Sequence, residues 1–274
     1  MRGDAPDFLL RRVADDLAER LEIVQRTFPM TACLGALHGV LGRRIQALPA
    51  VGTVITVESC PRMLAMCEAP RVLASEEALP FAEASLDLAV SALTLQLVND
   101  LPGALVQIRR ALKPDGLFLA SLLGGETLKE LRESWLIAES EIEGGASPRV
   151  APFADVRDLG ALLQRAGFAL PVADSERVTV TYASPLALMR EIKAMGASNM
   201  LTARRRKPVS RRLLFRAAEV YSEKFARSGG RVPATFEIIT LTAWVPHESQ
   251  QKPLPPGSAR TRLADALGVK EEKT

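Results

Sequence analysis

The chain has 274 residues, of which 47% are hydrophobic and 24% charged, and its formal net charge is +3 at pH 7. These values describe a globular protein with a sizeable core, and so small a positive charge gives no reason to expect a nucleic-acid ligand. The three cysteines and two histidines are too few and too widely spaced for a disulfide framework or a zinc knuckle, so no metal site is expected.

The first segment, residues 4–28, predicts an amphipathic helix, because its apolar side chains recur at three- and four-residue steps. Asp4 or Asp7 is expected to cap its start, and Pro29 is expected to end it. The same two acidic residues argue against a secretory or transit signal. No apolar run approaches the roughly 20 residues that a membrane-spanning helix needs, so we expect a cytoplasmic protein with at most peripheral membrane contact.

Strands and helices then alternate as far as residue 123. Short apolar runs predict strands at residues 30–34, 53–57, 72–74, 86–93 and 117–123, with helices at 39–48, 61–66 and 102–112. Nearly continuous apolar runs are typical of strands buried on both faces of a parallel sheet. The order of elements therefore predicts a doubly wound α/β sheet, which binds ligands at the carboxyl ends of its strands.

The rest of the chain is mainly helical. Helices are expected at residues 127–142, 156–166, 185–195 and 210–227, and strands at 176–182 and 236–245. The residues after Gln250 are rich in proline and then in charge, which predicts a disordered tail. The densest positive charge lies at Arg204–Arg212, which is either the solvated start of a helix or a surface for an acidic protein, RNA or lipid.

Two strand ends carry residues that suit a ligand. Gly35 and Gly39 follow the first strand and allow a tight turn with a close backbone approach to a bound molecule. Glu58 ends the second strand, where a carboxylate is able to accept hydrogen bonds from ribose hydroxyls. The alternatives are an ordinary strand-to-helix turn and a solvated loop carboxylate.

Motifs in the middle of the chain resemble a known family. Ser75-Glu76-Glu77-Ala78-Leu79-Pro80-Phe81 precedes a small-residue turn and a strand, and the helix at 102–112 ends in Lys113-Pro114-Asp115-Gly116. Together these segments resemble the class I S-adenosylmethionine-dependent methyltransferases. The resemblance implies a Rossmann-like sheet of seven strands with helical lid insertions, and S-adenosylmethionine as the cofactor. It implies a cofactor site formed by Gly35, Ala36, Gly39, Glu58, Ser59, Ser75, Glu76 and Ser91.

The same resemblance divides the chain into an N-terminal helix (1–28), a cofactor-binding half (29–123), lid helices and last strands of the same domain (124–249) and a tail (250–274). Segments at 122–132, 144–149, 195–199 and 232–235 are similar to the methyltransferase-like assembly factors of respiratory complex I, whose mitochondrial member is associated with arginine hydroxylation of a complex I subunit. The biotin-pathway malonyl-carrier-protein methyltransferase shares the Leu-Pro-Phe segment. The resemblance implies that this protein is a bacterial relative of the assembly factors. It also implies that the acceptor or partner is a protein, such as a complex I subunit.

The chain departs from the family pattern at three positions. The family carries Asp-x-Gly-x-Gly-x-Gly in the first loop, whereas this chain has Cys33 for the Asp and Leu37 for the middle Gly, and Ser75 stands for the acid that contacts adenine. A neutral thiol offers no charge to the amino group of the cofactor's methionine. Losing a charge-assisted hydrogen bond costs about 1.5–3 kcal/mol, or roughly ten- to hundredfold in affinity.

Two residues are candidates for catalysis. Gln96 follows the fourth strand and is expected either to face the reacting group or to serve packing, and His38 is either a general base or a solvent-facing loop residue. The leading hypothesis is methyl transfer to, or another modification of, a protein acceptor. The alternatives are a catalytically weakened assembly factor or binding protein, and an RNA methyltransferase that uses Arg204–Arg212.

Overall fold

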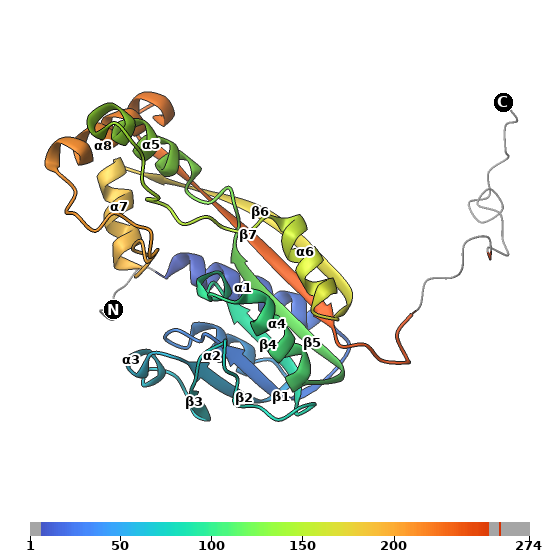
Figure 1. The fold of residues 1–274 in the computed structure, drawn as a ribbon. Helices are drawn as coiled ribbons and strands as arrows, with labels where there is room; N and C mark the ends of the chain where they lie inside the picture. The colour runs from blue at the N-terminus through green and yellow to red at the C-terminus, as the bar shows by residue number, and fades with distance from the viewer. Residues whose placement is uncertain (1–6, 252–257, 259–274) are drawn as a thin grey trace, which may run out of the picture.

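The structure, a computed structural model, describes residues 7–251 and Ser258. Asp4 and nearly all of the expected tail therefore lie outside the described residues. One seven-stranded sheet runs through the molecule in the order β3-β2-β1-β4-β5-β7-β6 (Figure 1). Its strands are β1 (Phe28–Leu34), β2 (Val51–Glu58), β3 (Arg71–Leu73), β4 (Leu86–Ala92), β5 (Leu112–Leu123), β6 (Ala169–Tyr182) and β7 (Val232–Trp244).

The expected α/β class and seven-stranded Rossmann-like sheet are confirmed, but the expectation of parallel strands holds only for part of the sheet. Strands β1 to β5 pair in parallel, whereas β7 is antiparallel to both of its neighbours, β5 and β6. An apolar run does not reveal its direction, because direction depends on how the chain returns to the sheet. The switch from β1 to β4 lies at the middle of the sheet, where open α/β sheets bind ligands.

Helices cover both faces of the sheet. The side chains of α1 (Phe8–Ile23), α2 (Val40–Gln46), α5 (Lys129–Glu143), α7 (Pro185–Ala194) and α8 (Arg211–Phe225) join one apolar core. Those of η1 (Leu95–Leu97), α4 (Leu101–Ala111) and α6 (Val156–Arg165) join the other, and the short α3 (Pro61–Leu64) follows β2. Strand β1 divides its side chains between the two cores, because Ala32 and Leu34 enter the second core while Cys33 enters the first.

The start of the chain differs from expectation in two respects. Helix α1 ends at Ile23 rather than at Pro29, which instead lies inside β1, and the backbone N–H of Phe28 already pairs with Ala50. Asp7 occupies the N-cap position but makes no side-chain cap hydrogen bond. Its carboxylate pairs with Arg11 instead, 2.8 Å away, so an ion pair has replaced the cap.

The Lys113–Gly116 segment is a bulge within β5 rather than a turn before it. Leu86 pairs with Leu112 and Leu88 with Leu117, so the residues between bulge out of the ladder, and Asp115 has a φ of 63°. Figure 1 shows β6 and β7 extending past the parallel strands, with α5, α7 and α8 gathered at their far end. These three helices lie within residues 124–249, where the lid is expected. Among the described residues, no helix combines the length and apolar character that crossing a bilayer requires.

Candidate functional site

The turn after β1 has the backbone that a glycine-rich loop requires. Gly35, Leu37 and Gly39 all have positive φ, at 60°, 50° and 81°. The left-handed region costs a residue with a Cβ atom roughly 1–2 kcal/mol, so Leu37 occupies a glycine position under strain. The backbone N–H of Ala36 donates to Val57 O at 3.1 Å, which ties the turn to the end of β2.

Glu58 stabilises this turn directly. Its Oε2 accepts a hydrogen bond from the backbone N–H of Leu37 at 2.7 Å, and its Oε1 accepts one from the N–H of Cys60 at 2.9 Å. The side chain is buried, with 6% of the residue exposed. A carboxylate has about four lone-pair sites, so two remain for hydroxyl groups of a ligand. Glu58 therefore has a structural role that its sequence position did not reveal.

A second carboxylate reaches the same turn from the segment after β3. An ideal Cβ on Gly35 would lie 2.1 Å from Thr94 Oγ1 and 2.3 Å from Glu76 Oε1, so only glycine leaves room for both side chains. Thr94 hydrogen-bonds both Glu76 and, at 3.0 Å, the hydroxyl of the fully buried Ser91. Burial raises the pKa of Glu76, and the carboxylates of Glu58 and Glu77 add to that effect. The ends of β1 and β4 and the segment after β3 thus meet at Gly35.

Cys33 does not supply a charge to this site. It is fully buried, and burial raises the pKa of its thiol to about 12, with further contributions from Cys67 and Glu58. The thiol is therefore neutral at physiological pH. An ideal Cβ on Gly42 of α2 would lie 3.9 Å from its sulfur, which indicates that the side chain points toward the core beneath α2.

The other polar residues expected in the cofactor site have different surroundings. The hydroxyl of Ser75 accepts the backbone N–H of Glu77 at 3.2 Å, and Ser59 is exposed beside Glu58. Glu77 accepts the backbone N–H groups of Asn99 and Asp100 at 2.9 and 2.8 Å, which fixes the entry to α4. Glu77 is therefore a structural residue, and Glu76 is the one that turns inward.

The two catalytic candidates are not brought together by any contact that the structure describes. Gln96 lies in η1 and donates from Nε2 to Leu93 O at 2.7 Å, while its Oε1 is buried and has no hydrogen-bond donor among the described residues. His38 Nε2 lies 3.5 Å from Asp7 Oδ2, so its ring faces the start of α1. Thr94, which sequence reasoning missed, links three parts of the site. It follows the end of β4. Because α/β sheets bind ligands at the carboxyl ends of their strands, a search of those ends would have found it.

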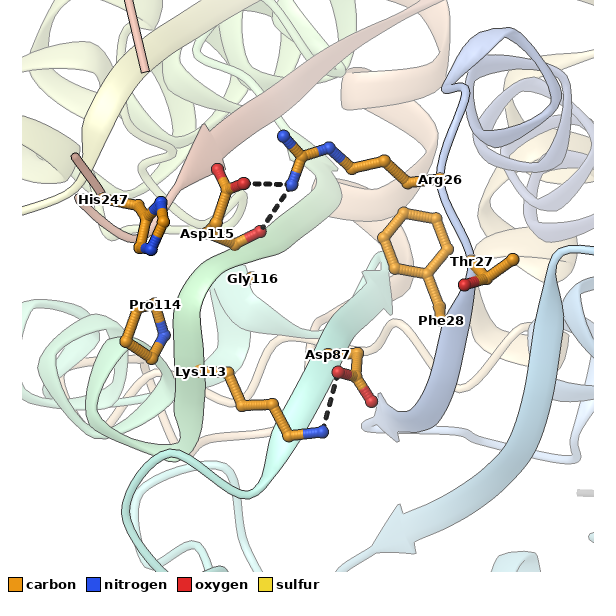
Figure 2. Close-up of a pocket in the computed structure, with 9 residues that line it drawn as sticks. All are labelled: Arg26, Thr27, Phe28, Asp87, Lys113, Pro114, Asp115, Gly116 and His247. Atoms are coloured by element: carbon orange, nitrogen blue, oxygen red, sulfur yellow. Dashed lines mark hydrogen bonds and ion pairs between the residues drawn. The ribbon is translucent and has the colours of Figure 1, made fainter. Parts of the chain in front are cut away.

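Two cavities lie away from the glycine turn. One, of about 320 Å³, lies at the amino-terminal ends of β1 and β4, on the opposite edge of the sheet. Figure 2 shows that two ion pairs line it, Arg26 with Asp115 and Lys113 with Asp87. The other, of about 430 Å³, lies between α5 and α8. The charged groups of the first cavity satisfy one another, so we assign it no ligand.

Comparison with known proteins agrees with this geometry. Residues 33–120, from the end of β1 to β5, match the model of a methyltransferase domain. The arginine-hydroxylase NDUFAF5, mitochondrial, of Danio rerio is 40% identical over 263 residues, which span 94% of this chain and 82% of that protein. The chain belongs to the class I S-adenosylmethionine-dependent methyltransferases.

Two further proteins are similar to this chain. Malonyl-(acyl-carrier protein) O-methyltransferase of Halorhodospira halophila is 38% identical over 251 residues, which span 89% of this chain and 83% of that protein. The crystal structure of YcgJ from Bacillus subtilis has a TM-score of 0.58 at 14% identity and covers 85% of this chain and 99% of its own. That last likeness supports the fold alone.

The residues present fit the family's cofactor in part. The glycine turn and the free lone pairs of Glu58 suit a ribose and its neighbouring groups, whereas the neutral thiol of Cys33 does not suit an ammonium group. Among residues 7–251, no three His, Cys, Asp or Glu side chains lie together in a way that would hold a metal ion.

Proposed function

We propose that this methyltransferase-fold protein binds S-adenosylmethionine at the carboxyl edge of β1, β2 and β4 and modifies a protein-borne acceptor. The observation that supports the proposal is the convergence of Gly35, Glu58 and Glu76 at one edge of the sheet. When bound, S-adenosylmethionine supplies an electrophilic methyl group on a sulfonium. Glu58 would hold the ribose hydroxyls with its free lone pairs, while its hydrogen bond to Leu37 keeps the turn in shape.

Gln96 is the residue we propose to orient the acceptor. Its buried Oε1 has no donor among the described residues, and an unsatisfied buried acceptor costs about 1–3 kcal/mol. An N–H group of the acceptor would satisfy it. The names of the relatives, an arginine hydroxylase and a malonyl-(acyl-carrier protein) O-methyltransferase, support an acceptor that is part of a protein or is carried by one. We extend the proposal to a respiratory complex I subunit on the strength of the assembly-factor resemblance.

The acceptor would enter beneath the lid. The loop that follows α5 is fixed there, because Glu139 accepts hydrogen bonds from Ser147 N at 2.6 Å and Arg149 Nε at 2.8 Å. Arg149 also lies over the ring of Trp135, 5.0 Å from its centroid. The proposed compartment is the cytoplasm, which the three free thiols support.

A binding protein without catalysis is the second candidate, and the neutral, buried thiol at Cys33 favours it. Isothermal titration of the purified chain with S-adenosylmethionine tests the leading proposal. We expect binding in the micromolar range. No heat of binding at millimolar ligand would refute it.

Co-purification followed by mass spectrometry of the captured partner tests the acceptor. A methylated partner carries the mass of one added methyl group, whereas a hydroxylated one carries one added oxygen atom, which requires an oxidant from outside the chain. An unmodified partner bound in stoichiometric amounts would favour the binding protein.

A further inference from the structure

The donor molecule brings a positive charge that this site must accommodate. The methionine part of S-adenosylmethionine carries an α-ammonium group, and a buried cation needs an anion or several hydrogen-bond acceptors. Cys33, at the position where the family has an aspartate, is fully buried and carries a neutral thiol. The charge must therefore be matched from elsewhere in the site.

Glu76 is the buried carboxylate that reaches the glycine turn from another part of the chain. Its Oε1 lies where a Cβ on Gly35 would be, within 2.3 Å of that position, and the residue is only 9% exposed. The Thr94 hydroxyl beside it is held by Ser91, so Glu76 lies between the ends of β1 and β4. This is the switch point of the sheet, where a bound molecule would meet both strands.

No cation of the described residues accompanies this carboxylate. Glu76 forms no ion pair within 4.0 Å among them, and the titratable groups that act on it are the carboxylates of Glu58 and Glu77. Removing a carboxylate from water without a counter-ion is unfavourable. Such an arrangement is explained if a cation comes from a ligand.

We propose that Glu76 binds the α-ammonium group of the donor at Gly35 and so replaces the charge that Cys33 lacks. This deepens the proposed function and rests on it. The other role open to Glu76 is contact with the adenine amine, which the family assigns to the preceding position, here Ser75. The position of Glu76 against the first glycine of the turn favours the amino-acid part of the donor over the base.

Two ligands that differ only in the amino-acid part separate these roles. S-adenosylhomocysteine carries the ammonium group, whereas 5′-methylthioadenosine keeps the adenine, ribose and thioether but lacks it. Both are titrated calorimetrically into the wild-type chain and into Glu76→Gln. We expect Glu76→Gln to weaken S-adenosylhomocysteine binding roughly ten- to hundredfold and to change 5′-methylthioadenosine binding less than about twofold.

Glu83→Gln is the matched control, because Glu83 is exposed and pairs with Arg110 on α4. It should leave both affinities unchanged. Thermal unfolding of Glu76→Gln checks the fold, and loss of a buried charge should leave the variant at least as stable as the wild type at neutral pH. Equal weakening of both ligands would assign Glu76 to adenine and overturn the inference, as would no weakening of either. If the wild type bound neither ligand, the proposed function itself would be refuted, and this inference would be refuted because it rests on that function.

Discussion

Replacing Glu58 by glutamine tests whether this carboxylate shapes the glycine turn as well as a ligand site. The side chain keeps its size, but glutamine offers one oxygen where the structure uses two. In the wild type these two oxygens accept from Leu37 N at 2.7 Å and Cys60 N at 2.9 Å, and only 6% of the residue is exposed. In the variant, one N–H would face the amide NH₂ group, so one charge-assisted bond is lost and the other becomes neutral.

The expected cost follows from these contacts. A hydrogen bond to a charged group contributes about 1.5–3 kcal/mol, and the bond to Leu37 also holds a φ of 50° that costs about 1–2 kcal/mol on its own. We expect the free energy of unfolding to fall by about 2–3 kcal/mol. For a chain of this size that corresponds to a Tm lower by about 4–12 °C.

Thermal and urea unfolding followed by circular dichroism measure this effect without any ligand. Glu68→Gln, an exposed glutamate between α3 and β3, serves as the control and should shift the Tm by less than about 2 °C. A Glu58→Gln variant as stable as this control would refute the structural role. Its affinity for S-adenosylmethionine should also fall, since the same oxygens have the lone pairs for ribose.

Two further predictions concern the same site and its lid. Glu139→Gln breaks the ion pair between the buried Glu139 and the partly exposed Arg149, which should cost about 1.5–3 kcal/mol in urea unfolding and open residues 144–149 to proteolysis. Because burial raises the folded-state pKa of Glu76, its contribution to stability is present at low pH and is lost as pH rises through that pKa. Glu76→Gln should therefore gain stability over the wild type between about pH 4 and pH 7, and a constant difference would exclude a raised pKa.

Local patterns were sufficient to predict the elements and their order. Every helix and strand expected between residues 4 and 245 is present, with bounds that differ by a few residues at most sites, because periodicity and turn residues act over short distances. The largest error is at the start of β6, which begins at Ala169 rather than at Glu176. Two further errors lie at Pro29 and at Lys113–Gly116. In both places a residue typical of a turn is accommodated inside a strand, since pairing with a neighbouring strand compensates for its poor local preference.

The direction of β7 could not be predicted from local sequence patterns, for a different reason. Its apolar run, Phe236–Val245, is compatible with either direction, and only the return of the chain from α8 to the far end of β5 makes it antiparallel. Strand pairing is a contact between residues far apart in the chain, so no window of sequence contains it.

The site shows the same division between sequence and tertiary structure. The sequence alone determined that Gly35, Gly39 and Glu58 follow buried strands, and that Cys33 and Leu37 replace an acid and a glycine. Packing decided what those residues do. Burial makes the Cys33 thiol neutral, and the positions of strands β1 and β4 let Glu76, rather than its neighbour Glu77, reach Gly35. A residue type is a local fact, but its charge state and its partner depend on the low-dielectric surroundings that only the folded chain assembles.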